Sequence, residues 1–133
     1  MSTSNTAVKA YTLRHGTLWR TDDATPVIAV SIPTRPGHVY TVRVSALAID
    51  QVNQSIGAYE RIACFYAFNA NTLFGQGLIT DLLTVGTGAV TLVPIGMDIK
   101  VRITGVAGFN FSWQIATDVM ECGHHIPFGG KLS

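Results

Sequence analysis

Apolar and polar residues alternate along several segments of the chain, which is the pattern of strands with one buried face. In residues 38–50 the even positions from Tyr40 to Ala48 are apolar, and Thr41, Arg43 and Ser45 occupy the other face. Residues 98–104 and 109–121 alternate in the same way, with Trp113 on the apolar side of the second segment. The apolar positions of these strands are Tyr40, Val42, Val44, Ala46, Ala48, Ile99, Val101, Ile103, Phe109, Phe111, Trp113, Ile115 and Val119.

Residues 58–70 differ, because they are apolar on both faces. One face carries Ile62, Cys64, Tyr66 and Phe68, and the other carries Ala63, Phe65 and Ala67. A strand that is apolar on both sides is typical of a position inside a sheet with both faces covered. We therefore predict a central strand here, covered by the core on one side and by a neighbour on the other.

Shorter segments complete the pattern. A β-branched run at 27–32 ends at Pro33, residues 90–93 form a short apolar run, and residues 73–85 contain glycines typical of a bulge or tight bend. No segment shows a convincing helical period, and turn residues separate the runs. The sequence predicts an all-β fold, an antiparallel β-sandwich of jelly-roll-like type with about seven to eight strands.

The chain divides into three parts. Residues 1–25 are expected to be an extended N-terminal arm with one short strand near 11–14, residues 26–121 the sandwich, and residues 122–133 a C-terminal tail. Trp19 lies in the arm, where it would contact a partner, since tryptophan is enriched at the energetic centres of interfaces. We expect the arm to be dispensable for folding and important for attachment.

Composition narrows the classes of function. The 133 residues suit one domain, and 47% of them are hydrophobic, enough to build a core. Charged residues make up 13%, against about 25% in an ordinary soluble domain, and the net charge is +1. A net charge this close to zero provides no excess of basic residues to bind a nucleic-acid backbone. No apolar run is long enough for a membrane helix. Because interface cores are depleted in charge, we expect part of the surface to be buried against other subunits.

No segment carries recognisable chemistry. Cys122, His124 and His125 form a ligand-like cluster, but Cys64, His15 and His38 do not complete a zinc-site spacing. A Cys64–Cys122 disulfide stays possible. The aspartates fit solvated turns, and the glycine-rich pieces lack the features of a phosphate loop. We expect no catalytic, cofactor-binding or metal-binding residue, and no enzymatic activity. The aspartates and glycines considered are Asp22, Asp23, Asp81, Asp98, Gly75, Gly77, Gly86 and Gly88.

One stretch carries a family resemblance. Residues 101–113, Val-Arg-Ile-Thr-Gly-Val-Ala-Gly-Phe-Asn-Phe-Ser-Trp, are similar to a recurring ending V-x-V-T-G-x-x-G-x-x-x-x-W, which a last strand follows. Together with the strands at 39–46 and 59–68, the segment from Tyr40 to Glu121 resembles small β-sandwich domains of tailed-phage virion proteins. Such domains occur in tail fibres and in proteins that decorate the capsid, and they often assemble as trimers.

The resemblance implies a structural virion protein of a bacteriophage. The leading hypothesis is a capsid decoration or cement protein, a homotrimer that binds the major capsid protein on the capsid exterior and staples capsomers. It would be assembled in the host cytoplasm and reside on the capsid surface. A tail fibre or baseplate component is the alternative. A carbohydrate-binding β-sandwich and a small enzyme are the other classes of function considered.

Overall fold

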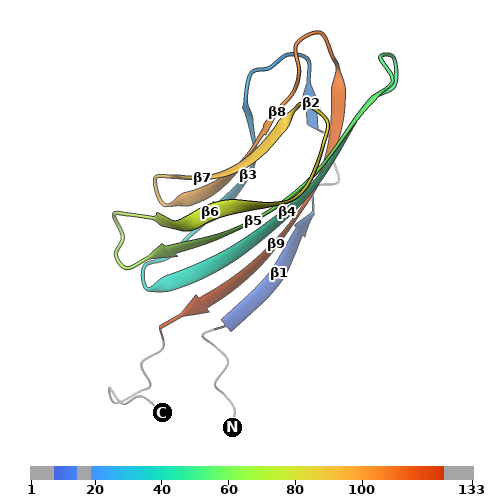
Figure 1. Ribbon diagram of the computed structural model, residues 1–133. Helices are drawn as coiled ribbons and strands as arrows, with labels where there is room; N and C mark the ends of the chain where they lie inside the picture. The colour runs from blue at the N-terminus through green and yellow to red at the C-terminus, as the bar shows by residue number, and fades with distance from the viewer. Residues whose placement is uncertain (1–7, 15–18, 125–133) are drawn as a thin grey trace, which may run out of the picture.

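The computed structural model describes residues 8–14 and 19–124, which form nine strands and no helix, so no membrane-spanning helix occurs in them. The strands lie in two antiparallel sheets, which confirms the all-β sandwich (Figure 1). The strands are β1 (Val8–Arg14), β2 (Trp19–Thr21), β3 (Val27–Pro33), β4 (His38–Asp50), β5 (Ser55–Ala67), β6 (Phe74–Val85), β7 (Ala89–Ile95), β8 (Asp98–Thr104) and β9 (Phe111–Gly123).

The two sheets differ in size. The large sheet has the order β1-β9-β4-β5-β6, with β2 also paired to β9, and the small sheet has the order β3-β8-β7. Strands β4, β5 and β6 follow one another as a meander, while the chain passes between the sheets before β3, β4, β7 and β9. The β4–β5 hairpin extends beyond the small sheet (Figure 1). One face of the large sheet packs on the small sheet, and the opposite face is called the outer face here.

The core lies between the two sheets. The residues of β4, β8 and β9 that the alternation predicts to face inward are buried there. The five apolar even positions of β4 are buried, and so are Ile99, Val101 and Ile103 of β8. Trp113 is 1% exposed and stacks on Tyr59 with ring centroids 5.7 Å apart. Its indole nitrogen donates a hydrogen bond of 2.9 Å to the hydroxyl of Thr21. The register expected for β9 is therefore confirmed.

Part of the segment expected to be an arm lies in the large sheet. β1 pairs with β9 from Val8 opposite Cys122 to Arg14 opposite Ala116, and β2 places Trp19 opposite Trp113. The physical reason is that β9 would otherwise present a row of unpaired backbone groups at a sheet edge. Trp19 also packs partly against the core, and not only on a partner as we expected. Residues 1–7 of the arm lie outside the described part of the chain.

Strand β5 is central, as predicted, because it lies between β4 and β6. Its odd-numbered side chains face the core. Its even-numbered side chains lie on the outer face, half-buried or exposed, and the second cover that we expected is not provided by the described residues. The irregularity expected in residues 73–85 is also present, since the β5–β6 register shifts between Ile62 and Cys64.

Candidate functional site

The outer face of the large sheet is the candidate site, because it exposes large apolar side chains at both of its ends. Near the start of β4 it carries an apolar group that we call the strand-end patch. Around the β4–β5 turn it carries a second group, the hairpin patch. The strand-end patch consists of Val39, Tyr66, Phe68, Phe74, Met120 and Cys122, and the hairpin patch of Leu47, Ile49 and Ile56.

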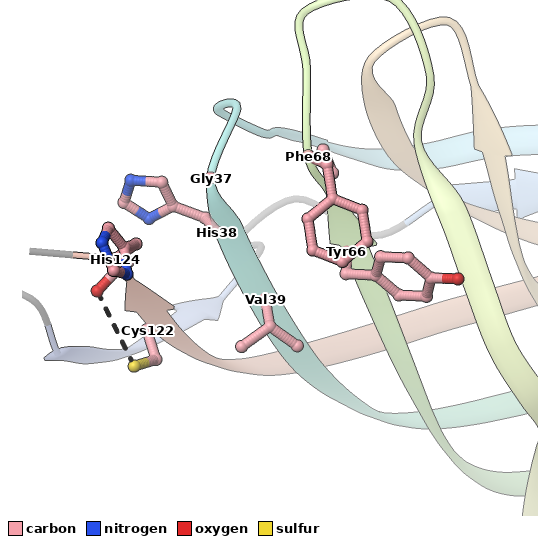
Figure 2. Close-up of a pocket in the computed structure, with 9 residues that line it drawn as sticks. Gly37, His38, Val39, Tyr66, Phe68, Cys122 and His124 are labelled. Atoms are coloured by element: carbon pink, nitrogen blue, oxygen red, sulfur yellow. Dashed lines mark hydrogen bonds between the residues drawn. The ribbon is translucent and has the colours of Figure 1, made fainter.

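A hollow of about 790 Å³ opens at the strand-end patch (Figure 2). It is lined by residues from the start of β4, the end of β5 and the end of β9, so that three strand ends meet around it. Phe68 projects at its rim and is 78% exposed. The lining residues are Gly37, His38, Val39, Tyr66, Ala67, Phe68, Cys122, Gly123 and His124.

Aromatic contacts order this end of the sheet. The ring of Tyr66 stacks on Phe74 of the neighbouring strand at 5.2 Å between centroids, and it also contacts Phe68 at 5.2 Å. The turn that follows is closed by Asn69, whose side-chain oxygen accepts hydrogen bonds from the backbone N–H groups of Asn71 and Thr72. The three rings therefore form a held apolar surface, with Phe68 at its most exposed point.

A buried carboxylate supports the hollow from the core side. Glu121 is 5% exposed, and its Oε2 accepts hydrogen bonds from Arg35 Nη2 at 2.8 Å and from the Tyr40 hydroxyl at 3.0 Å. The Nδ1 atom of His38 lies 2.8 Å from the same oxygen. These groups tie the end of β9 to the start of β4 and the loop before it. At Gly123 a side chain would collide with the His38 ring in its present position, so any larger residue would displace that ring.

Electrostatics at Glu121 favour the charged form. Burial alone would raise the pKa of this carboxyl group, but the hydrogen bonds from Arg35 and Tyr40 and the positive charge of Arg35 outweigh burial and lower it. The pKa of the Tyr40 hydroxyl is raised, chiefly by burial. Because Oε2 of Glu121 already accepts hydrogen bonds from Arg35 and Tyr40, this carboxylate has a structural role. The arrangement therefore acts as a structural clamp between the end of β9 and the start of β4.

The hairpin patch lies at the other end of the same face. Leu47 is 61% exposed, and an apolar groove of about 370 Å³ runs between its neighbours on β4, β5 and β9. The hairpin is held by Asp50, which accepts hydrogen bonds from the Asn53 side chain at 2.7 Å and from the Asn110 backbone at 2.9 Å. The bond to Asn110 joins the hairpin to the β8–β9 loop. This patch is therefore presented on a fixed strand pair.

Charges on the outer face lie between the two patches. Arg43 of β4 forms a 2.7 Å ion pair with Glu60 of β5, and Asp118 of β9 is opposite Arg43 in the strand register. Neither patch contains a charged side chain. The outer face thus has apolar groups at both ends, and between them it carries these charged side chains together with the exposed Leu83 of β6, which is opposite Glu60.

The ligand-like residues of the sequence do not come together as a metal site. Cys122 and His124 are exposed at the hollow beside His38, while Cys64 is half-buried on β5. Within residues 8–14 and 19–124, no three His, Cys, Asp or Glu side chains are grouped so that they could hold a metal ion. His15 and His125 lie outside the described residues.

Both cysteines are free. Strand β4 lies between them, with Thr41 paired to Cys64 and Val39 paired to Cys122. Two strand spacings put their backbones about 10 Å apart, beyond the roughly 7 Å that a disulfide can bridge. The Cys64–Cys122 disulfide is therefore incompatible with this fold.

The aspartates considered as candidates have structural or solvent-exposed positions. Asp81 pairs with the buried Arg61 at 2.9 Å, and Asp98 lies 3.3 Å from Lys100. Asp22 and Asp23 are exposed. None of them contributes to the two patches.

The two patches were missed at the level of sequence. The polar face of β4 becomes apolar after Ser45, since Leu47 and Ile49 occupy the same side as Thr41 and Arg43. That break in alternation was a signal that one face of the strand changes character along its length. The apolar outer positions of β5 gave the same signal at the opposite end of the sheet.

Comparison with known proteins adds little to this geometry. No protein-family model matches the sequence, and no curated protein matches it. One similar solved structure is the tailspike protein of Acinetobacter phage vB_ApiP_P1, with 14% identity, a TM-score of 0.35, and coverage of 92% of this chain and 22% of that chain. Another is the tailspike protein of Acinetobacter baumannii phage AM24, with 10% identity, a TM-score of 0.41, and coverage of 94% and 28%. This chain thus spans about a quarter of each, and the similarity concerns the β-rich fold alone.

Proposed function

We propose that the chain is a structural protein of a tailed-phage virion and that it works by assembling with copies of itself through the outer face of the large sheet. The observation that carries the assembling role is the pair of uncharged apolar patches on this face. The sequence resemblance of residues 40–121 to virion β-sandwich domains supports the virion as its setting. No catalytic step belongs to this role.

The size of the face supports assembly. Strands β4, β5 and β9 are each 13 residues long and β6 has 12, so these four neighbouring strands of the large sheet extend over roughly 19 by 43 Å, or about 800 Å². A stable protein–protein interface buries about 800 Å² on each partner. Exposed apolar patches of more than a few hundred Å² usually mark interaction sites. The outer face is therefore large enough to hold copies of the chain together.

The proposal includes an oligomeric state and two locations. The copies form a homotrimer, in which each chain contributes its outer face to contacts with its neighbours. One location is the capsid exterior, where the trimer would bind the major capsid protein and staple capsomers. The other is the tail, as a fibre or baseplate component. In both, several weak contacts acting together give strong attachment without new chemistry.

Purified virions test the proposal. An antibody against the isolated chain should detect it in virions from which soluble protein has been removed. Gold-labelled antibody should then decorate either the capsid or the tail in electron micrographs, which separates the two locations. Absence of the chain from purified virions, with the same antibody detecting it in the infected-cell lysate, would contradict a virion role.

A further inference from the structure

We propose that the strand-end patch of one copy packs against the hairpin patch of a second copy. This inference deepens the proposed function, since it rests on assembly through the outer face and names the two surfaces that meet. The occupant of each patch is thus the unlike patch of another copy of this chain.

The two patches are complementary in shape and chemistry. The strand-end patch combines the hollow of about 790 Å³ with the projecting ring of Phe68, and the hairpin patch combines the groove of about 370 Å³ with Leu47 and Ile49. The strand-end patch therefore offers the larger space, and the hairpin patch offers apolar side chains on an extended strand pair that can enter it. Both are uncharged, so neither leaves an unpaired charge buried when they meet.

Pairing of unlike patches is favoured over pairing of like ones. Two strand-end patches would oppose two hollows of about 790 Å³ each, and one Phe68 ring from each copy would leave most of that space without packing atoms. The hairpin, which extends beyond the small sheet, can instead reach the hollow of a neighbour (Figure 1). Its tip residue Val52 is 91% exposed. After one contact between unlike patches, one copy keeps a free hairpin patch and the other a free strand-end patch, until further copies close the assembly into a ring.

Both surfaces are held in place before any partner arrives. Asp50 bonds the hairpin to the loop before β9, and Glu121 clamps the strand ends around the hollow. Rigid surfaces lose less conformational freedom on association than mobile ones do. The contact should therefore need no rearrangement of the sandwich.

Site-directed cross-linking of the full chain tests the contact. Cys122 lines the hollow, so a Cys64→Ser change leaves one natural thiol at the strand-end patch. Adding Val52→Cys places a second thiol at the hairpin tip. Within one chain these two positions are separated by roughly 36 Å along β4, too far for a short bis-maleimide. A cross-link between them must therefore join two copies.

The matched control places the second thiol elsewhere on the surface. Ile28→Cys introduces a thiol on β3 of the small sheet, where Ile28 is 38% exposed. We expect the Val52→Cys chain to give cross-linked dimers and trimers, with at least a tenfold higher yield than the Ile28→Cys chain. Peptide mapping should find position 52 joined to Cys122.

Three results would overturn the inference. Equal cross-linking from positions 52 and 28 would show random collision, and an oligomer that gives no link between position 52 and Cys122 would use another surface. A monomer whose patches are covered by its own terminal residues would overturn it as well. None of these results bears on whether the chain is present in virions, so failure here is distinguishable from failure of the virion role.

Discussion

Glu121 illustrates how one buried residue joins two strand ends beside the strand-end hollow. It is a buried acid, which costs free energy unless its charge is paired and hydrogen-bonded. Arg35 and Tyr40 supply those bonds, and His38 lies beside them. The lowered pKa of the carboxyl group means that the folded state binds the proton less tightly than the unfolded state does. This carboxylate therefore contributes stability that depends on pH.

Replacing Glu121 by Gln should lower the free energy of unfolding by about 2 kcal/mol at pH 7, because charge-assisted hydrogen bonds are lost. The group contributes fully above its unfolded pKa of about 4.5 and loses its contribution as the pH falls through the lower folded pKa. The difference in Tm between the two proteins should therefore shrink below pH 4.5. Thermal melts between pH 7 and 3 measure it.

The control for this prediction is Glu60→Gln, which breaks the more exposed ion pair with Arg43. The Glu60→Gln change should lower the free energy of unfolding by less than about 1 kcal/mol, since surface ion pairs contribute little to stability. A Glu121→Gln variant as stable as the Glu60→Gln variant at pH 7 would show that the clamp does not stabilise the fold.

Trp113→Ala should lower the free energy of unfolding by about 3–5 kcal/mol, because a fully buried ring is removed and a cavity remains. Thr21→Val should cost about 1–3 kcal/mol by leaving the indole N–H without its acceptor. Urea unfolding followed by circular dichroism measures both. A loss below about 1 kcal/mol for Trp113→Ala would contradict its position between the sheets.

At the scale of elements, the strands at the two ends of the chain depend on each other. β9 pairs with β4 along one side and with β1 and β2 along the other, so the N-terminal strands cover an edge that would otherwise be open. Thr21 of β2 also accepts the hydrogen bond of Trp113. The segment expected to be an arm is therefore partly a structural element of the large sheet.

A chain that begins at Thr25 should melt at a lower temperature than one that begins at Val8, which retains both strands. The truncation exposes the edge of β9 and leaves the indole N–H unpaired, each of which lowers stability. Circular dichroism melts of the two proteins under identical conditions provide the comparison. Equal melting temperatures would mean that the arm is dispensable for folding, as the sequence alone led us to expect.

The sequence predicted the elements well where one side of a strand alternates strictly. In β4 and β8 the buried positions follow directly from a period of two, because each inward side chain must be apolar. The sequence did not predict the position of a strand in its sheet where that position depends on pairing with a distant segment of the chain. The weak strand character of residues 11–14 does not reveal that β1 pairs with β9, since that contact joins opposite ends of the chain. The strand-end hollow was unpredictable for the same reason, because it needs three separate strand ends.

At the scale of the whole molecule, the inner face of the large sheet is buried in the core, and its outer face carries two exposed apolar patches. The small sheet covers the inner side of the large sheet, and no described residue covers the outer side. Charged residues are too few to make that face an ordinary solvated surface, since they amount to 13% of the chain. Association of copies is the simplest way to cover it.

Ile49→Ser should weaken association of copies at least tenfold, because it places a polar side chain in the hairpin patch. Ile95→Ser is the matched control, since Ile95 is 47% exposed against 51% for Ile49 but lies on β7 of the small sheet. Both variants should keep the far-ultraviolet circular dichroism of the parent. Sedimentation equilibrium of the three proteins compares their association constants, and equal weakening by both changes would argue against the outer face.

The most direct test of the account is the mass of the unmodified chain in solution, measured by multi-angle light scattering at micromolar concentration. The proposed homotrimer predicts a discrete species with three times the mass of one chain, which persists on dilution. Because the proposed contacts use the outer face, that species should be lost in Ile49→Ser but not in Ile95→Ser. A single species with the mass of one chain across the whole concentration range would contradict the claim that the chain assembles with itself.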